Sequence, residues 1–141
     1  MKISILLPYK EDYASEYAGA VSLFVNHINK LGINSKTTKI FGNTTYKKTL
    51  SNQYINIDLE KKILQSSSKL YVKKFIILQK KINSDLIEVH NRPNYIKQIR
   101  DKISGTNLTL FFHNDPIKMN GSKTVKDRIY LLENLNHIIF N

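Results

Sequence analysis

Short apolar segments alternate with amphipathic stretches along the whole chain, and this alternation limits the fold more than any other feature of the sequence. Residues 3–7 form an apolar run that ends at Pro8, and residues 108–112 form the most hydrophobic run. A strand that is apolar throughout is buried on both faces, which is typical of parallel sheets. Because a helix usually carries the chain back between parallel strands, the pattern predicts an α/β fold with a doubly wound parallel sheet.

The spacing of apolar residues also predicts the bounds of the elements. From Ala20 onward apolar residues recur every three or four positions until Gly32, which we expect to end the helix in a left-handed conformation. Three serines, Ser66 to Ser68, interrupt a second helical pattern and are expected to split it. The predicted strands span residues 3–7, 33–41, 53–58, 85–89, 108–112 and 138–140, and the predicted helices span residues 20–31, 59–82, 95–103 and 125–135.

The size and charge of the chain narrow the class of partner. Its 141 residues suffice for one domain with a single hydrophobic core. Lysine and arginine number 22 and acidic residues 11, so the net charge of +11 favours phosphate-rich partners such as nucleic acid, anionic lipid or sugar nucleotides. The only arginines are Arg92, Arg100 and Arg128. Because arginine is the usual reader of base edges, we expect no sequence-specific contact with nucleic acid.

The absence of cysteine and the absence of long apolar runs exclude further classes of protein. The chain has no cysteine, which excludes a disulfide scaffold, a thiolate metal site and a cysteine nucleophile. The apolar run after Met1 is too short for a signal peptide, and no later run approaches the length of a membrane span. We therefore expect a cytoplasmic protein.

Two histidines follow predicted strands in the same local pattern. His90 and His113 each come directly after a strand, and each is followed by asparagine, a variable residue and proline. In parallel α/β sheets, ligands bind outside the carboxyl ends of the strands. Imidazole and amide groups offer both donors and acceptors, which suits the hydroxyls of a sugar. The alternative is that both segments are turns whose side chains bond only to local backbone.

Other titratable residues give weaker signals. His27 on the first helix and His137 before the last strand are expected to be structural, since neither follows the carboxyl end of a strand. Glu88 lies inside an apolar strand, where a carboxylate either has a partner, faces a wet crevice or sits near the surface. A metal site built from Glu88, Asp115 and the two strand-end histidines lacks the usual ligand spacings, so we expect no metal cofactor.

Glycine and lysine segments suggest anion contacts. Gly19 opens the first helix, where backbone N–H groups can approach an anion, but the G-x-G-x-x-G fingerprint of NAD sites is absent. Residues 121–124, Gly-Ser-Lys-Thr, lack the spacing of a phosphate loop, and we expect Ser122 or Thr124 to cap the following helix. The lysines of residues 61–81 could contact an anionic membrane, although a solvated helix face is the commoner outcome.

Three stretches of the sequence together carry a family resemblance. They are Glu16-Tyr17-Ala18-Gly19-Ala20-Val21, the segment from Asp85 to Pro93, and Phe112-His113-Asn114-Asp115-Pro116. The chain resembles the amino-terminal half of glycosyltransferase family 4 along its whole length. The resemblance is specific only in these three stretches. The resemblance implies the GT-B architecture, in which two Rossmann-like domains face a cleft. It also implies metal-independent, retaining transfer of a sugar from a nucleotide-sugar donor to a lipid-linked or surface glycan acceptor.

The same resemblance implies roles for individual residues. Gly19 would lie near the donor diphosphate and the acceptor. His113 matches the family histidine that contacts the donor sugar near the reacting carbon, and Asp115 is expected to contact a hydroxyl of the sugar or acceptor. The residues that would line the acceptor side are His90, Asn91 and Arg92, with Asn114 as a further substrate-binding residue.

The resemblance covers one of the family's two domains. The nucleotide-holding domain with its paired glutamates has no counterpart before the chain stops at Asn141. We therefore expect residues 1–141 to be the acceptor-side domain of a glycosyltransferase, inactive in isolation, with a nucleotide sugar as substrate and no other cofactor. The alternatives are a non-catalytic basic module that binds phosphate or nucleic acid, and a scaffold at an anionic membrane surface.

Overall fold

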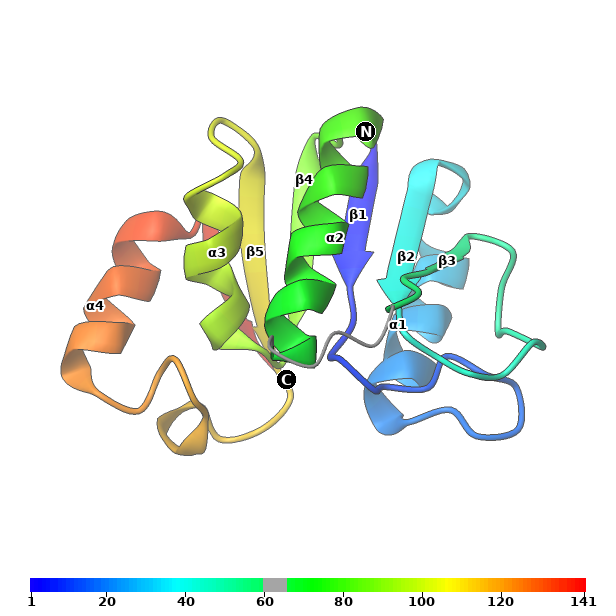
Figure 1. Cartoon of the computed structure of the whole chain (residues 1–141), viewed down its shortest axis with the longest axis horizontal. Coiled ribbons are helices and arrows are strands. Elements are labelled where there is room, and N and C mark those ends of the chain that lie inside the picture. The colour runs from blue at the N-terminus through cyan, green and yellow to red at the C-terminus, as the bar shows by residue number, and fades with distance from the viewer. Residues whose placement is uncertain (60–65) are drawn as a thin grey trace.

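The computed structural model describes residues 1–59 and 66–141 and contains one six-stranded parallel sheet (Figure 1). Its strands are β1 (Ile3–Leu6), β2 (Thr38–Gly42), β3 (Tyr54–Asn56), β4 (Leu86–His90), β5 (Asn107–Phe112) and β6 (His137–Phe140). Their spatial order is β3-β2-β1-β4-β5-β6. The chain therefore winds outward from β1 in one direction and then returns to wind outward from β4 in the other. This confirms the predicted doubly wound, Rossmann-like α/β fold and creates a switch point between β1 and β4.

Helices cover both faces of the sheet, but unequally (Figure 1). On one face, α1 (Ala20–Leu31) packs Val21 and Val25 against the β1 and β2 side chains Ile5 and Ile40. The opposite face carries α2 (Ser67–Ile82), α3 (Ile96–Arg100) and α4 (Val125–Asn134), which enclose the larger apolar cluster. The apolar periodicity of the sequence thus marks the faces that the helices bury.

The segment after α1 differs from the prediction. The expected strand at residues 33–41 begins only at Thr38, after a 3-10 helix at Ser35–Thr37. The Thr37 hydroxyl donates to the carbonyl of Met1 at 2.6 Å, which anchors this turn, and Ile33 is fully exposed. The left-handed conformation expected at Gly32 is wrong: its φ of −75° and ψ of 138° are extended.

Most other bounds differ by a few residues. The strand expected at residues 53–58 is shorter, and the helix expected at residues 95–103 is a 3-10 turn, Pro93–Tyr95, followed by the single-turn α3. The second predicted helix begins at Ser67, directly after the Ser66 cap position, while residues 60–65 of that prediction lie outside the described residues. The predicted cap of α4 is confirmed, because the Thr124 side chain accepts from the backbone N–H of Asp127 and the Asp127 carboxylate accepts from that of Thr124.

Buried polar groups fix the sheet against α2. The hydroxyl of Tyr71 donates to the carbonyls of Leu7 at 2.9 Å and Phe41 at 3.3 Å, just beyond β1 and inside β2. At the opposite end of the strands, the Ser4 hydroxyl donates to Gln79 at 2.6 Å. Because buried polar groups are costly when unpaired, these bonds set the position of α2 and hold the carboxyl edge of the sheet in place.

Candidate functional site

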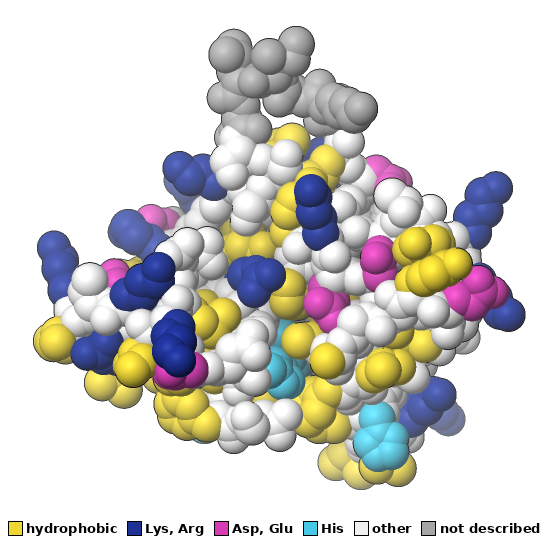
Figure 2. Space-filling view, turned by 90° about the horizontal axis from the view of Figure 1, so that it is seen from below, with side chains coloured by type: hydrophobic (Ala, Val, Ile, Leu, Met, Phe, Trp, Pro, Cys, Tyr) yellow, Lys and Arg dark blue, Asp and Glu magenta, His cyan; other side chains and the backbone are white. Residues whose placement is uncertain are grey.

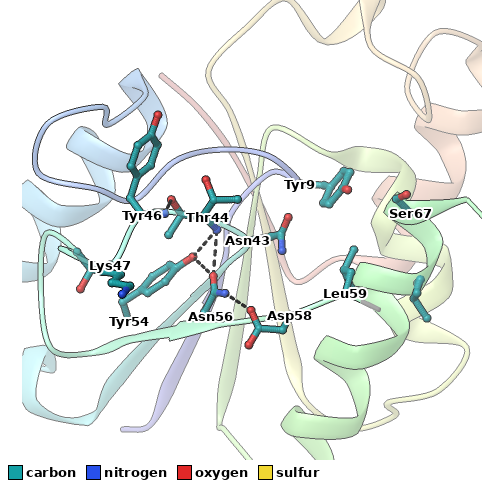
Figure 3. A pocket seen from close by; sticks show the side chains of 13 residues that line it. Tyr9, Asn43, Thr44, Tyr46, Lys47, Tyr54, Asn56, Asp58, Leu59 and Ser67 are labelled. Atoms are coloured by element: carbon teal, nitrogen blue, oxygen red, sulfur yellow. Dashed lines mark hydrogen bonds between the residues drawn. The ribbon is translucent and has the colours of Figure 1, made fainter. Parts of the chain in front are cut away.

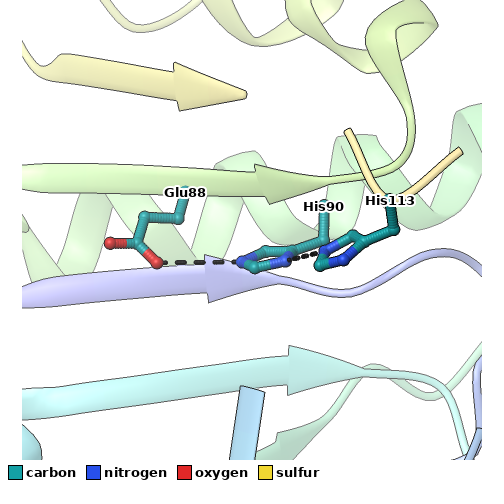
Figure 4. Close-up of polar contacts among 3 residues, drawn as sticks. All are labelled: Glu88, His90 and His113. Atoms are coloured by element: carbon teal, nitrogen blue, oxygen red, sulfur yellow. Dashed lines mark hydrogen bonds and ion pairs between the residues drawn. The ribbon is translucent and has the colours of Figure 1, made fainter. Parts of the chain in front are cut away.

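The two strand-end histidines meet at the carboxyl edge of the sheet (Figure 4). His90 is the last residue of β4, and His113 follows β5 directly. Their Nδ1 and Nε2 atoms, respectively, lie 2.9 Å apart, within hydrogen-bonding distance. The parallel register of β4 and β5 places the two residues side by side, because His90 lies opposite Phe111, two residues before His113.

His90 is the inner member of this pair. Its residue is only 2% exposed, and its ring stacks on Phe111 with centroids 4.6 Å apart and planes 5° apart. Its Nε2 lies 3.7 Å from Oε2 of Glu88, too far for a hydrogen bond, and that nitrogen has no hydrogen-bond partner among the described residues. We expected His90 to line a ligand site. Its ring instead lies buried beneath His113 and does not line the site.

Figure 4 shows Glu88, His90 and His113 in one row that leads from inside the sheet to its edge. The carboxylate of Glu88 favours a proton on the nearer nitrogen of His90, Nε2. Nδ1 of His90 then accepts a hydrogen bond from Nε2–H of His113. In that arrangement Nδ1 of His113 carries a lone pair, which lies 3.4 Å from the side-chain amide nitrogen of Asn141.

His113 is held in its neutral form. Burial, with a smaller contribution from the neighbouring His90, lowers the pKa of His113 to about 4. The rings of Phe24 and His113 form an edge-to-face pair with centroids 4.8 Å apart. At neutral pH this side chain is therefore an uncharged group with one donor nitrogen and one acceptor nitrogen.

A pocket of about 540 Å³ opens at this edge beside the switch point of the sheet. It unites four residues that the sequence assigned to a site: Asn91, Arg92, His113 and Asn114. Its other lining residues come from the loop after β1, from α1 and from the chain end: Pro8, Glu11, Ala20, Val21, Phe24 and Asn141.

Asn91 organises the wall of this pocket. It adopts the left-handed region with φ of 56°, which asparagine tolerates better than most residues. Its Oδ1 accepts from the backbone N–H of His113 at 3.2 Å, and its carbonyl accepts from the Arg92 guanidinium at 2.8 Å. Asn91 of the first His-Asn-x-Pro segment thus fixes the backbone of the second segment. The side chains of Arg92 and Asn114 lie at the pocket opening, where they can contact a ligand.

Gly19 lies beside this pocket in a setting that the sequence did not predict. It is the N-cap residue of α1, and the carboxylate of Glu11 occupies the space next to it, accepting from the backbone N–H of Ser22 at 3.1 Å. A Cβ at Gly19 would lie only 2.1 Å from Oε1 of Glu11. The positive end of α1 is thus neutralised by a carboxylate of the chain itself.

Asp115 does not join the pocket. Its side chain accepts from the backbone N–H of Ile117 at 3.1 Å and lies 3.5 Å from the ammonium of Lys118, so it caps a 3-10 helix, Pro116–Lys118. The geometry gives Asp115 the role of a turn residue, in place of the expected contact with a hydroxyl of the sugar or acceptor.

A second, larger pocket of about 950 Å³ lies at the ends of β2 and β3, and the sequence analysis missed it (Figure 3). The Tyr54 hydroxyl donates to Oδ1 of Asn56 at 2.9 Å, and both oxygens accept from the backbone N–H of Thr44. Alternation of polar and apolar residues from Tyr54 to Asp58 is the signal that could have placed these polar groups on one face.

On the face of the molecule that Figure 2 shows, the basic side chains of the described residues do not gather into one patch. Figure 2 looks onto the carboxyl ends of the strands and shows lysine and arginine side chains scattered from the centre of this face to its rim, with carboxylates among them. On α2, the described lysines that are exposed are Lys69, Lys73, Lys80 and Lys81. Lys74 instead donates to the carbonyl of Asp58. On the face seen in Figure 2, the basic side chains are therefore dispersed.

Within residues 1–59 and 66–141, no three His, Asp or Glu side chains lie close enough together to hold a metal ion. In the same part of the chain, no helix has the length and apolar character needed to cross a bilayer. Comparison of the chain with protein-family models, with curated proteins and with solved structures returns no significant match.

Proposed function

We propose that the pocket between β1, α1 and the two His-Asn-x-Pro segments binds the hydroxyl groups of a sugar, and that the chain is the acceptor-side domain of a retaining glycosyltransferase. The observation that carries this proposal is the neutral imidazole of His113 at the pocket wall, fixed by its hydrogen bond to buried His90. The acceptor nitrogen of this neutral imidazole is Nδ1, which the Asn141 amide contacts at 3.4 Å. A sugar hydroxyl that takes the place of this amide can donate to Nδ1, and a neutral imidazole has no ionic preference for phosphate.

The other lining groups suit the same ligand. A sugar presents several hydroxyls that each donate and accept, and the pocket offers the carboxylate of Glu11, the amide of Asn114 and the guanidinium of Arg92. The ring of Phe24 supplies an apolar surface against which the C–H face of a pyranose could rest. Polar groups directed at a few positions within a partly apolar wall are characteristic of small-molecule sites.

The position of Glu11 changes which part of a nucleotide sugar is expected here. A diphosphate at Gly19 would meet the carboxylate of Glu11 at the end of α1. The sugar ring is the better match for this pocket, with the phosphates directed away from α1. In the two-domain architecture that the family resemblance implies, the second domain would hold the nucleotide.

In this proposal the chain contributes positioning and electrostatics to the transfer. As the nucleotide leaves, positive charge develops near the anomeric carbon, and groups that are already oriented stabilise it without reorganisation. His113 would hold a sugar hydroxyl in place, and Glu11 would favour the developing positive charge. His90 acts through His113 and is a positioning residue.

The test is a titration followed by NMR of the ¹⁵N-labelled chain. A panel of nucleotide sugars, the matching nucleotides and free sugars is added in turn. We expect sugar-containing ligands to shift the signals of Asn91, His113 and Asn114. His113→Ala should weaken the binding by about tenfold, the cost of about one hydrogen bond to a fixed group.

His27→Ala is the matched control, because it removes an exposed histidine of α1 that does not line the pocket. The sugar-site proposal fails if the ligand shifts map to other residues, or if His113→Ala and His27→Ala bind equally well. Tight, salt-sensitive binding of oligonucleotides without any response to sugars would instead support the basic phosphate-binding module.

A further inference from the structure

An apolar stripe runs along the outer side of α4. Val125, Ile129 and Leu132 are spaced i, i+4 and i+7 and are 64%, 50% and 71% exposed. This spacing places them on one side of the helix. Leu131 is buried in the core, and Tyr130 faces α3, where the ammonium of Lys97 lies 5.5 Å from its ring. The stripe therefore points away from α3, toward the side of the molecule where the last strand, β6, forms the lateral edge of the sheet.

The neighbouring strand β6 is an unprotected sheet edge. It pairs with β5, and no other strand in the described part of the chain pairs with its outer side. Its residues His137 to Phe140 include no lysine, proline or acidic side chain, and Phe140 is 67% exposed. Open edges usually carry such residues because free backbone groups recruit further strands.

A cleft joins the helix stripe to the strand edge. It has a volume of about 140 Å³ and lies between α4 and β6. Its apolar lining includes Leu131 and Leu132 from α4 and Ile138 and Phe140 from β6. The stripe, the cleft and the edge are thus one continuous surface, which we call the α4–β6 face.

We propose that the α4–β6 face binds a second copy of this chain across a two-fold axis. The axis would stand perpendicular to the sheet beside β6, so that the two β6 strands pair antiparallel and the sheets become continuous. Because α4 connects β5 to β6 and lies along the same edge, the two α4 helices then run antiparallel over the joined sheet. Each buries its stripe against the other.

The charges of α4 fit this arrangement. Lys126 and Glu133 are seven residues apart and lie on the same flank of the stripe. In an antiparallel pair of helices centred near Ile129, Lys126 faces Glu133 of the second copy, and symmetry repeats the pair. The helix carries two basic and two acidic residues, so it is neutral in a chain of net charge +11. The α4–β6 face is consequently a place where two copies can approach with less local repulsion than a lysine-rich face would impose.

The association is tested by sedimentation equilibrium of the full chain, from low micromolar to near-millimolar concentration. We expect a reversible dimer whose Kd rises at least about tenfold in Ile129→Asp. Ile77→Asp is the matched control, because Ile77 is also 50% exposed but lies on α2. A chain that stays monomeric throughout, or a dimer that both variants weaken equally, overturns the proposal.

A charge exchange tests the antiparallel register. Lys126→Glu and Glu133→Lys should each raise the Kd about fivefold, because each places like charges opposite one another twice. The double variant restores opposite charges and the original net charge, and its Kd should return to the wild-type value. A double variant that is weaker than both single variants would overturn the register.

Discussion

Lowering the pH should destabilise this protein through His113. The folded chain holds the pKa of this imidazole at about 4, whereas its ordinary value is 6.5, because burial and the neighbouring His90 disfavour the charged form. The unfolded chain therefore binds a proton more readily between these two values. The stabilising contribution is fully present above pH 6.5 and is lost as the pH falls toward 4.

The magnitude follows from the size of the shift. Between pH 7.5 and pH 5, the lowered pKa of His113 corresponds to about 2 kcal/mol of unfolding free energy. Because the ring lines an open pocket, solvent screens part of this, and we expect about 1 kcal/mol to be lost.

The assay is urea unfolding at the two pH values. Wild type should lose more stability on acidification than His113→Gln, and His27→Gln should behave like wild type, because it removes an exposed histidine. An NMR titration gives the pKa of His113 directly. A midpoint near 6.5, or equal pH dependence in wild type and His113→Gln, would refute the reasoning.

Three further substitutions test other parts of the structure. Tyr71→Phe removes the hydroxyl that donates to the carbonyl of Leu7 and one of two donors to the carbonyl of Phe41, which keeps the backbone N–H of Leu7. It should lower the unfolding free energy in urea by about 1–2 kcal/mol. Gly121→Ala places a Cβ 2.5 Å from the backbone nitrogen of Asn94 at a φ of 95°, so it should cost about 1–3 kcal/mol by the same measurement. Glu88→Gln removes the charge that selects the His90 tautomer; ¹⁵N shifts should show a lower Nε2–H fraction, and any sugar affinity should fall about twofold.

The fold could be predicted from the sequence because its central strands are apolar on both faces. The mostly apolar segments of β1, β4 and β5 indicate that these strands are buried, and the crossover helices between them have regular apolar spacing. Errors arose where the pattern was weak. The weak alternation of residues 33–41 placed Ile33 in the predicted second strand, but Ile33 is fully exposed. The chain first makes a 3-10 turn, in which the Thr37 hydroxyl donates to the carbonyls of Met1 and Asn34.

The site was predictable in part for the same reason. Parallel register guarantees that residues at the ends of neighbouring strands lie together, so His90 and His113 could be paired from sequence alone. Which ring is buried depends on the stacking of Phe111 and on the position of Phe24, and neither contact has a local sequence signal. Asp115 follows the same pattern but points elsewhere, because a proline after it begins a turn that the carboxylate caps.

The carboxylate of Glu11 at the start of α1 acts as a tethered competitor for the only end of that helix that attracts negative charge. A free phosphate must displace the Glu11 carboxylate, which stays at the helix end because it is part of the chain. A neutral, hydroxyl-bearing compound can instead donate hydrogen bonds to the oxygens of this carboxylate. Gly19 consequently leaves room for the Glu11 carboxylate of the protein's own loop. A single methyl group added at position 19 would displace this carboxylate and expose the helix end to anions from solution.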